Sequence, residues 1–552
     1  MTTVTRQLSR NDPVEDGFWR RREMTGRSVI MRGSPSSWPS SLGRRNSFVG
    51  FAERSPFNDS IQRWGARRGF VYWFLLLLMA GCTVGPDFKK PAAPKVSGYT
   101  AASLATTESV TNVSGGEAQR FVEAGDIPGE WWKVFHSKPL NDLIERALTN
   151  SPNIKSAQAA LTIARENVLA QRGSYYPSAS ASFSATRAKT SEQIAPVPNA
   201  NRFYYSLFTP QVSVSYSPDV FGLNRRTMES LKAQQEQARF ALAATHITLS
   251  ANVVSAAVQE ASLRAQIAAT RELLVANTNM LQILRNQQAG GYANRLDVAA
   301  QEAQLAQMEA TLPPLLKQIE QQRDLLVALA GGFPGEELQE RFELSTLQLP
   351  EDLPVSLPSQ LVEQRPDVRQ AEENLHAASA QIGVAVANRI PNITLSADAG
   401  SMALEAGKIF AGGTSFWDLT AGITHPIFEG GALMHKERAA RAAYVQAAEQ
   451  YRGTVVAAFQ NVADTLHALE QDAAALKASA AGKEAAGVSL ELAKKQFQSG
   501  YSNYLALLSA EQAYQQAVIN MVQAEANRFA DTAALFQALG GGWWNRADVP
   551  GS

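Results

Sequence analysis

Four short segments alternate apolar and small polar residues with a period of two, which predicts β-strands whose two faces differ. They lie at about 177–187, 207–217, 391–400 and 415–425. In the third, Ile393, Leu395 and Ala397 fall on one face, and Thr394, Ser396 and Asp398 on the other. An apolar face opposite a small polar face suits a strand between lipid and water. A soluble antiparallel sheet with one buried face is the alternative interpretation.

Two much longer segments lack proline and are rich in Ala, Gln, Leu and Glu, which favour helix. They cover about 224–289 and 433–499, and each is followed by glycine, a common helix stop. At 1.5 Å per residue each helix would be roughly 100 Å long. Returning helices are expected at about 296–330 and 505–539, and Pro313–Pro314 should break or kink the first of these.

The same elements occur twice in the same order. Pro152 and Pro177 match Pro366 and Pro391, "GYANRLDV" matches "GYSNYLAL", and both halves close alike on "LVALAGG" and "LFQALGG". A duplicated helix–strand–strand–helix unit is therefore predicted at 136–332 and 361–542. Residues 333–360 are rich in Gly and Pro and form the expected equatorial connector, and 543–552 form a C-terminal tail.

The pattern of the N-terminal region indicates a targeting segment. Residues 69–82, "GFVYWFLLLLMAGC", follow three arginines and are shorter than the about 20 residues that a transmembrane helix needs. A basic flank, a short apolar run and small residues before a cysteine indicate a lipoprotein signal. We expect residues 1–81 to be a disordered extension plus signal peptide. Cys82 would be acylated, and 82–135 would form the lipid anchor and an N-terminal linker.

Composition argues against several classes of function. Lys plus Arg and Asp plus Glu both number 51, so the formal net charge is zero and nothing suggests a nucleic-acid partner. The single cysteine precludes an intrachain disulfide, and the six histidines lack metal-ligand spacing. No phosphate loop or nucleophile–base pair is found. We therefore expect no enzymatic activity, no metal and no cofactor.

Several motifs in order resemble those of the TolC-type outer-membrane efflux family, in its lipoprotein (NodT-like) branch. They are "LIERALTNSPNIKSAQAAL", "RPDVRQAEENLHAASAQIGVAVANRIPNITL", "HPIFEGGALMHKERAARAAYVQAAEQYRGTVVAAFQNVADTL", "SGYSNYLALLSAEQAYQQA" and "FQALGGGWW", spread over 131–544. The resemblance implies an α+β membrane duct. Its homotrimer would form a 12-stranded outer-membrane β-barrel and a long α-helical periplasmic barrel. Independently, four strands are too few for a closed barrel of about eight or more.

The resemblance implies the exit duct of a tripartite efflux pump, lipid-anchored in the outer membrane. A periplasmic adaptor and an inner-membrane transporter, expected to be of the RND type, would deliver small solutes or drugs to it. Metal-ion efflux and type I protein secretion are alternatives on the same scaffold. An alternative of another class is a periplasmic coiled-coil scaffold lipoprotein without a pore.

Regulation is expected at the periplasmic tip, in the turns 290–296 and 499–505. The resemblance implies a gate there, formed by Arg295, Asp297, Tyr501, Asn503, Tyr504 and Ser509. Adaptor contacts are expected at Gly291, Tyr292, Ala293, Asn294, Gly500 and Ser502. Related ducts often carry Asp where this chain has Ser502 and Ser509. We therefore expect the tip to be closed mainly by hydrogen bonds and packing.

Overall fold

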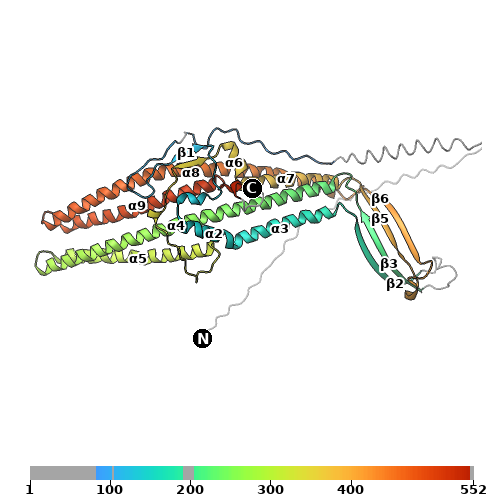
Figure 1. The fold of residues 1–552 in the computed structure, drawn as a ribbon, viewed down its shortest axis with the longest axis horizontal. Coiled ribbons are helices and arrows are strands. Elements are labelled where there is room, and N and C mark those ends of the chain that lie inside the picture. The colour runs from blue at the N-terminus through green and yellow to red at the C-terminus, as the bar shows by residue number, and fades with distance from the viewer. Residues whose placement is uncertain (1–82, 102–104, 191–203, 547–552) are drawn as a thin grey trace, which may run out of the picture. The chain divides into compact units, whose positions relative to one another are not determined.

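A computed structural model describes residues 83–101, 105–190 and 204–546, all of which belong to one compact unit. The repeated unit is visible in its element lengths (Figure 1). Helices α3 (Pro152–Gly173) and α7 (Pro366–Ala387) each have 22 residues. Helices α4 (Leu223–Ala289) and α8 (Ala432–Gln498) each have 67 residues, and α5 (Arg295–Leu329) and α9 (Tyr504–Ala538) each have 35.

A sheet of four antiparallel strands joins the two repeats. Its order is β2 (Ser178–Lys189), β3 (Tyr204–Tyr216), β5 (Asn392–Ser401) and β6 (Ser415–Thr424). The β3–β5 pair links the repeats, with Val214 opposite Ala397. Strands β2 and β6 are the outer members, so each has one edge without a partner strand in the described chain. The strands lie at the end of the long helices opposite to the two hairpin turns (Figure 1).

The apolar side of this sheet is not covered by the protein. Trp417, Leu419 and Ile423 on β6 are 75%, 74% and 73% exposed, and Phe183 on β2 is 62% exposed. Such a surface is unfavourable in water because apolar area is costly to hydrate. The sheet therefore presents a face that suits lipid.

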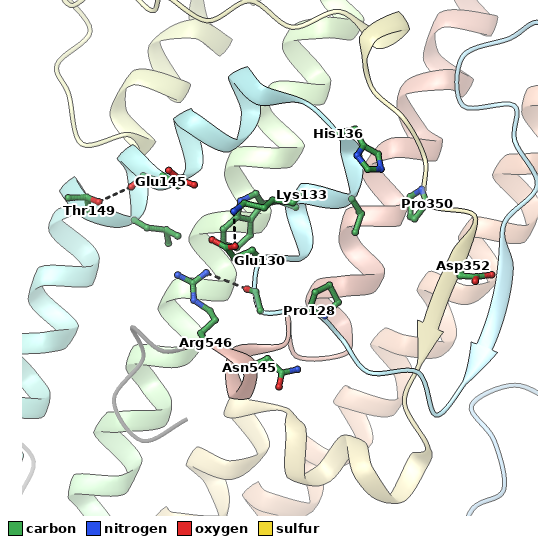
Figure 2. Close-up of a pocket in the computed structure, with 14 residues that line it drawn as sticks. Pro128, Glu130, Lys133, His136, Glu145, Thr149, Pro350, Asp352, Asn545 and Arg546 are labelled. Atoms are coloured by element: carbon green, nitrogen blue, oxygen red, sulfur yellow. Dashed lines mark hydrogen bonds and ion pairs between the residues drawn. The ribbon is translucent and has the colours of Figure 1, made fainter.

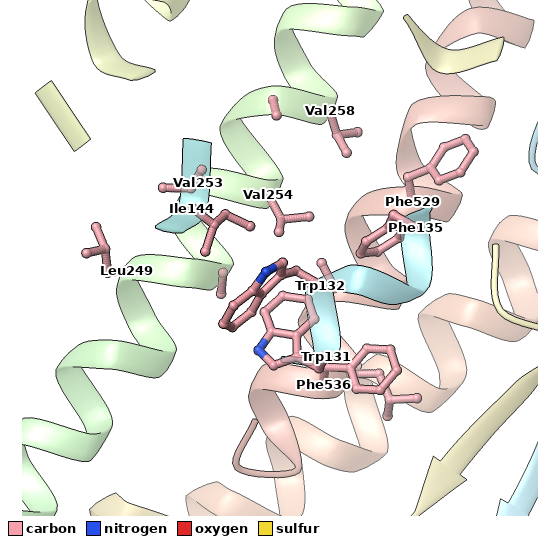
Figure 3. Close-up of a cluster of buried hydrophobic side chains, with 14 of the residues drawn as sticks. Trp131, Trp132, Phe135, Ile144, Leu249, Val253, Val254, Val258, Phe529 and Phe536 are labelled. Atoms are coloured by element: carbon pink, nitrogen blue, oxygen red, sulfur yellow. The ribbon is translucent and has the colours of Figure 1, made fainter. Parts of the chain in front are cut away.

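The main hydrophobic core lies midway along the helices, around η1 (Trp131–Phe135). Trp131 stacks on Phe536 of α9 with ring centroids 5.4 Å apart, and Phe135 meets Phe529 at 6.4 Å. Figure 3 shows these rings beside valines of α4. Helix α2 (Lys138–Asn150), α6 (Pro358–Gln364) and η2 (Leu344–Thr346) add apolar side chains to the same core.

Four small elements complete the described part of the structure. A parallel pair of strands, β1 (Arg120–Glu123) and β4 (Asp352–Val355), joins the N-terminal segment to the connector between the repeats. The 3₁₀ turn η3 (Ala406–Lys408) lies between β5 and β6, and η4 (Trp543–Asn545) follows α9. Helix α4 contains a stretch apolar enough to cross a membrane, but most of that stretch is buried inside the protein, as in a core helix.

The sequence analysis expected Pro313–Pro314 to break or kink α5. The break is wrong, because the helix continues through both prolines, and the kink stays a prediction. Each proline removes one donor, so the carbonyls of Glu309 and Ala310 lose their usual helical partners. Both residues are exposed, and water can satisfy these carbonyls without loss of the helix.

The described residues 83–101 and 105–125 of the N-terminal segment lie along the helices and are fastened at several points. The guanidinium of Arg226 on α4 donates to the carbonyl of Val84 at 3.0 Å and to the carboxylate of Asp87 at 2.7 Å. Phe88 stacks on His376 of α7 with ring centroids 4.3 Å apart. We call residues 83–101 and 105–125 the strap. It connects the region next to Cys82, which itself lies outside the described residues, to the central core.

Candidate functional site

The hairpins α4–α5 and α8–α9 turn in the same way. Gly291 and Gly500 follow the two long helices with φ of 78° and 76°, a left-handed conformation that glycine adopts without strain. In each turn the glycine amide and the next amide donate to carbonyls of the last helical turn at 2.8–3.1 Å. Asn294 and Asn503 then cap the returning helices. The two tips are therefore rigid, closely similar turns.

The expected adaptor-contact residues lie on these turns. Tyr292 and Tyr501 occupy matching positions, and each is 89% exposed. Gly291, Asn294 and Gly500 are also exposed, and Ala293 and Ser502 are half-buried. Two leucines that the sequence analysis did not single out, Leu296 and Leu505, are 71% and 57% exposed at matching positions. Each tip thus presents a tyrosine and a leucine to its surroundings.

The expected gate residues fall into two environments. Arg295, Tyr501, Asn503 and Ser509 are exposed. Asp297 is half-buried because its carboxylate completes a capping box with Asn294. Tyr504, by contrast, is only 2% exposed. The structure therefore separates Tyr504 from the other candidates.

Tyr504 connects the two hairpins. Its hydroxyl donates a hydrogen bond to Oε1 of Gln301 on α5. The Nε2 of Gln301 donates in turn to the Oδ1 of Asn277 on α4 at 3.0 Å and to its carbonyl at 2.9 Å. Burial raises the pKa of the Tyr504 hydroxyl far above its ordinary value, with smaller contributions from Glu511 and Asp297, so it remains a donor. We call Asn277, Gln301 and Tyr504 the clasp.

Packing and a second hydrogen bond support the clasp. The Nε2 of Gln512 on α9 donates to Oε1 of Gln304 on α5 at 2.7 Å. A small apolar cluster surrounds these amides, consisting of Leu281, Leu284, Val298, Leu490, Tyr504 and Leu507. The sequence analysis missed Asn277, Gln301 and Gln304. Alignment of the hairpins could have found them, because the matching positions of the second hairpin are Ala486, Ala510 and Ala513.

Charged groups near the tip occupy matching positions in the two hairpins. Arg285 and Glu302 form an ion pair at 2.7 Å between α4 and α5, with both side chains about half exposed. The corresponding residues of α8 and α9 are Lys494 and Glu511. Burial raises the pKa of Glu511, and the charge of Lys494 partly offsets this effect. The Arg285–Glu302 pair joins α4 to α5 within the first hairpin. Lys494 instead lies 3.7 Å from Glu491 of its own helix.

A hollow of about 1060 Å³ lies near the central core (Figure 2). Its walls carry mixed charges that mostly bind one another, as in the 2.7 Å pair between Lys133 and Glu130. Arg546 lies over the Trp132 ring at 5.1 Å and donates to the carbonyl of Gly129 at 3.4 Å. These side chains do not converge on a common point, so the hollow offers no catalytic arrangement.

Residues 83–101, 105–190 and 204–546 contain no candidate metal-binding site. Within that part of the chain no three His, Cys, Asp or Glu side chains lie close enough together to hold a metal ion. Cys82, the expected lipidation site, lies outside it. Val84, two residues after Cys82, donates its amide to the carbonyl of Phe221 at 3.3 Å, at the junction of the sheet and α4.

Comparison with known proteins gives a consistent result. The family model for "Outer membrane efflux protein" matches residues 143–332 and 357–541. The chain is 29% identical over 478 residues to the outer membrane protein OprJ of Pseudomonas aeruginosa, covering 85% of this chain and 95% of OprJ. It is 29% identical over 497 residues to the toluene efflux pump outer membrane protein TtgF of Pseudomonas putida, covering 86% and 97%.

Solved structures show the same fold. The outer-membrane channel OprN aligns with a TM-score of 0.75 at 26% identity, over 84% of this chain and 100% of OprN. The open state of the Neisseria gonorrhoeae MtrE outer membrane channel aligns with a TM-score of 0.72 at 25% identity, over 85% and 100%. The fold is therefore that of outer-membrane channels, with a helical tunnel and a β domain.

Proposed function

Because this chain belongs to the outer membrane efflux protein family, we propose that three copies of it form one passive exit duct whose periplasmic tip is both gate and docking site. Membership of the family makes the chain an outer-membrane channel of efflux pumps, with its helices in the periplasm. The number of copies, the gate and the partners are the proposal.

The open sheet is the single observation on which the proposal of a trimer depends. Strands β2 and β6 each leave one edge without a partner strand in the described chain, and the outward side chains are apolar. Unpaired backbone groups are not tolerated in the hydrocarbon core, and a barrel needs about eight or more strands. Three copies, joined from the β2 edge of one to the β6 edge of the next, would close a barrel of twelve strands.

Uncovered apolar residues on the helices support the same assembly. Ile163 on α3 is 63% exposed, and Val445 and Val456 on α8 are 59% and 61% exposed. Neighbouring copies would cover these side chains in a ring. The apolar area buried there would stabilise the trimer by about 25 cal/mol per Å².

The clasp supports a gate at the tip. It joins α9 to α5 and α4 through side chains that are buried together. Widening a ring of such hairpins requires α8–α9 to move away from α4–α5, and this movement must break the bond from Tyr504 to Gln301. The exposed residues Arg295, Asn503 and Ser509, together with Asp297 and Tyr501, would line or border the aperture.

The exposed tyrosine and leucine of each tip suit contact with a periplasmic adaptor. Aromatic side chains supply large contact area at low entropy cost and are frequent at interfaces. An inner-membrane transporter, of the RND type in this proposal, would provide the energy. Relatives are named for toluene efflux and for pyoverdine export, which favours small organic solutes over metal ions or proteins as cargo.

Cysteine crosslinking tests the trimer directly. Each variant would carry one cysteine on β2, at Ser182 or Ser184, and one on β6, at Thr420 or Ala421, and would be expressed in cells. Oxidation should give covalent dimers and trimers in the outer membrane. Pairs placed across β3 and β5, which are already neighbours within one chain, should give no intermolecular product. Monomers throughout the β2–β6 series would contradict the trimer.

Photo-crosslinking tests the docking site. A photoreactive residue at Asn503, at the tip, should capture a periplasmic adaptor identifiable by mass spectrometry. The same residue at Arg452, which lies far along α8 from the tip, is the matched control and should capture no adaptor. Equal capture at both positions would show that the tip is not the specific contact.

A further inference from the structure

The strap is held at two ends by different chemistry. Near the central core, the completely buried Arg528 of α9 donates to the strap carbonyls of Glu117 at 3.0 Å and Gly115 at 3.3 Å. At its N-terminal end the strap contacts Arg226 of α4 and His376 of α7, as described above. A guanidinium is charged at every relevant pH, whereas an imidazole changes its charge between about pH 5 and 8. The N-terminal end therefore contains a group that can respond to pH.

The imidazole of His376 lies between two carboxylates. Its Nε2 is 3.2 Å from Oε1 of Glu229 on α4, and its Nδ1 is 3.3 Å from Oε2 of Glu373 on α7. A carboxylate only accepts hydrogen bonds, and a neutral imidazole carries a single N–H group. With a neutral ring, one nitrogen would therefore present a lone pair to a carboxylate oxygen. A second proton on the ring removes this conflict and makes both contacts hydrogen bonds.

The orientation of this ring matters to the strap because its face holds Phe88. The two rings are stacked, with centroids 4.3 Å apart and planes inclined by 13°. Hydrogen bonds at both nitrogens of His376 keep the imidazole from turning, so its face stays toward Phe88. A positive charge over the face of a phenyl ring is also attracted by the ring electrons. The doubly protonated imidazole thus holds Phe88 by its orientation and by its charge.

Charged neighbours on α4, α7 and the strap extend this arrangement. The second oxygen of Glu229 accepts from Arg226 at 2.7 Å, so one carboxylate links both side chains that hold the strap. On α7, Glu372 accepts from Arg369 at 2.6 Å and lies 4.0 Å from Lys90 of the strap. The strap therefore docks on a connected network of charges.

The outer members of this network do not replace the second proton. Asp87 of the strap accepts from Arg226 at 2.7 Å, and Glu363 of α6 accepts from Lys90 at 3.0 Å. Tyr451 of α8 faces Glu372 and Arg369, and burial raises the pKa of its hydroxyl, so it stays neutral. The carboxylates of the network, Asp87, Glu229, Glu363, Glu372 and Glu373, outnumber its permanent cations, Arg226, Arg369 and Lys90. A further positive charge is therefore favourable here.

We propose that His376 is a pH-responsive latch for the N-terminal end of the strap. When the imidazole holds its second proton, Glu229 and Glu373 fix the ring and Phe88 stays docked. Loss of that proton makes one contact repulsive, frees the ring to turn and releases Phe88. Because the strap begins directly after Cys82, the latch would control how firmly the expected lipid-anchored end is joined to α4 and α7.

The latch closes as the pH falls. When the strap leaves, water reaches the imidazole and weakens its attraction to both carboxylates. The released state therefore binds the second proton less tightly than the docked state. Docking is strongest at low pH and weakens as the pH rises through the range in which the docked ring loses this proton. Burial raises the pKa of Glu373, against the opposing contact with His376, and a proton retained by this carboxyl acts in the same direction.

Trypsin cleavage after Lys89, in the full chain in detergent, tests the latch. Lys89 is exposed and follows Phe88, so this peptide bond becomes a substrate when the strap leaves the helices. Each rate is divided by the rate for a synthetic peptide of residues 83–95 at the same pH, which removes the pH dependence of trypsin. One linked proton allows a change of up to about tenfold per pH unit. We expect cleavage at least about fivefold faster at pH 8 than at pH 6.

Glu373→Gln gives the sharpest comparison. The new amide can donate to the bare nitrogen of a neutral imidazole, so the strap should stay docked at pH 8, with a change in rate of less than about twofold. His376→Gln cannot gain a charge and should also lose the pH dependence, whatever its level of cleavage. His435→Gln, at an exposed position of α8, is the matched control and should respond like the wild type.

The place of cleavage separates the latch from titration elsewhere. Burial raises the pKa values of Glu525 and Asp531 to about 7, in the segment of α9 that holds the other end of the strap. Cleavage after Arg120 monitors that end. An equal rise after Lys89 and Arg120, a wild-type response in Glu373→Gln, or no rise in the wild type would overturn the latch. The measurement needs neither the trimer nor conductance, so its failure would leave the proposed duct untouched.

Discussion

Tyr504 on α9 is buried and bonded to Gln301 on α5, whereas Arg295, its counterpart in the first hairpin, is exposed to solvent. The two turns are alike in backbone conformation, and each returning helix has an asparagine N-cap, which Asp297 completes into a capping box only in the first. The differences between the repeats at this position and at Gln301, which Ala510 replaces, therefore make one hairpin the donor and the other the acceptor. This asymmetry gives the duct a specific point at which the two hairpins must separate.

Tyr504→Phe should open the tip without disturbing the fold. The ring still fills the apolar cluster, but Oε1 of Gln301 loses its donor, which costs about 1–3 kcal/mol for a buried acceptor. We expect a higher open fraction in planar bilayers and greater passage of small dyes in cells. Tyr501→Phe, at an 89% exposed position, should behave like the wild type. Closed-state conductance unchanged in Tyr504→Phe would exclude the clasp as a gate element.

Gly383→Ala should detach the strap. A Cβ at Gly383 would lie 2.7 Å from Cγ of Arg226, and Gly85 of the strap packs directly on the Gly383 backbone. Overpacking of this kind typically costs about 1–3 kcal/mol. Gly453→Ala, where a Cβ meets nothing within 4 Å, should instead stabilise α8 by up to about 1 kcal/mol. Thermal unfolding and proteolysis near residue 85 measure both effects, and equal behaviour of the variants would refute the steric argument.

Arg528→Met should destabilise the central region strongly. The loss leaves the carbonyls of Gly115, Glu117 and Leu469 without this donor in a buried site, and a penalty of about 3 kcal/mol or more is expected. Limited proteolysis should then cut within 105–123. Arg452→Met is the control, because Arg452 is 78% exposed and its nearest carboxylate oxygen is 4.0 Å away. Unchanged protease resistance in Arg528→Met would show that Arg528 does not hold the strap.

Salt should have little effect on closure. The clasp consists of neutral groups, and the neighbouring Arg285–Glu302 pair is about half exposed, where such pairs contribute about 0–1 kcal/mol. Raising the salt from about 0.1 to 1 M shortens the screening length from about 10 to 3 Å. Closed-state conductance, divided by the conductivity of the solution, should change less than about twofold. A steep rise would mean that ion pairs hold the tip shut.

The sequence was sufficient to predict the fold because its strongest patterns are local or repeated. The two-residue alternation in the strands and the proline-free helical segments ending at Gly290 and Ser499 follow from local backbone and side-chain chemistry. The break predicted at Pro313–Pro314 was wrong because local helix propensity does not include solvent exposure. Glu309 and Ala310, whose carbonyls lose their helical donors, are exposed to water.

The side-chain contacts between hairpins could not be predicted in the same way. Tyr504 and Gln301 are 203 residues apart, and Tyr504 looks like an ordinary turn residue until α5 is placed beside it. The comparison of equivalent positions in the two repeats, which needs the sequence alone, would have indicated Gln301, because Ala510 stands at its position in the second hairpin.

The bonds from Arg528 to the strap also constrain how the chain reaches its final state. Arg528 and Gly115 are separated by 413 positions, so the first periplasmic segment to emerge meets its partner only when the last helix has arrived. Contacts of such high sequence separation form slowly, because loop closure must precede them. A chain exported from its N-terminus would hold the strap free throughout translocation, in a state open to proteases and periplasmic chaperones. The folding of α9 would then end that exposure. It would be the step that commits the subunit to assembly.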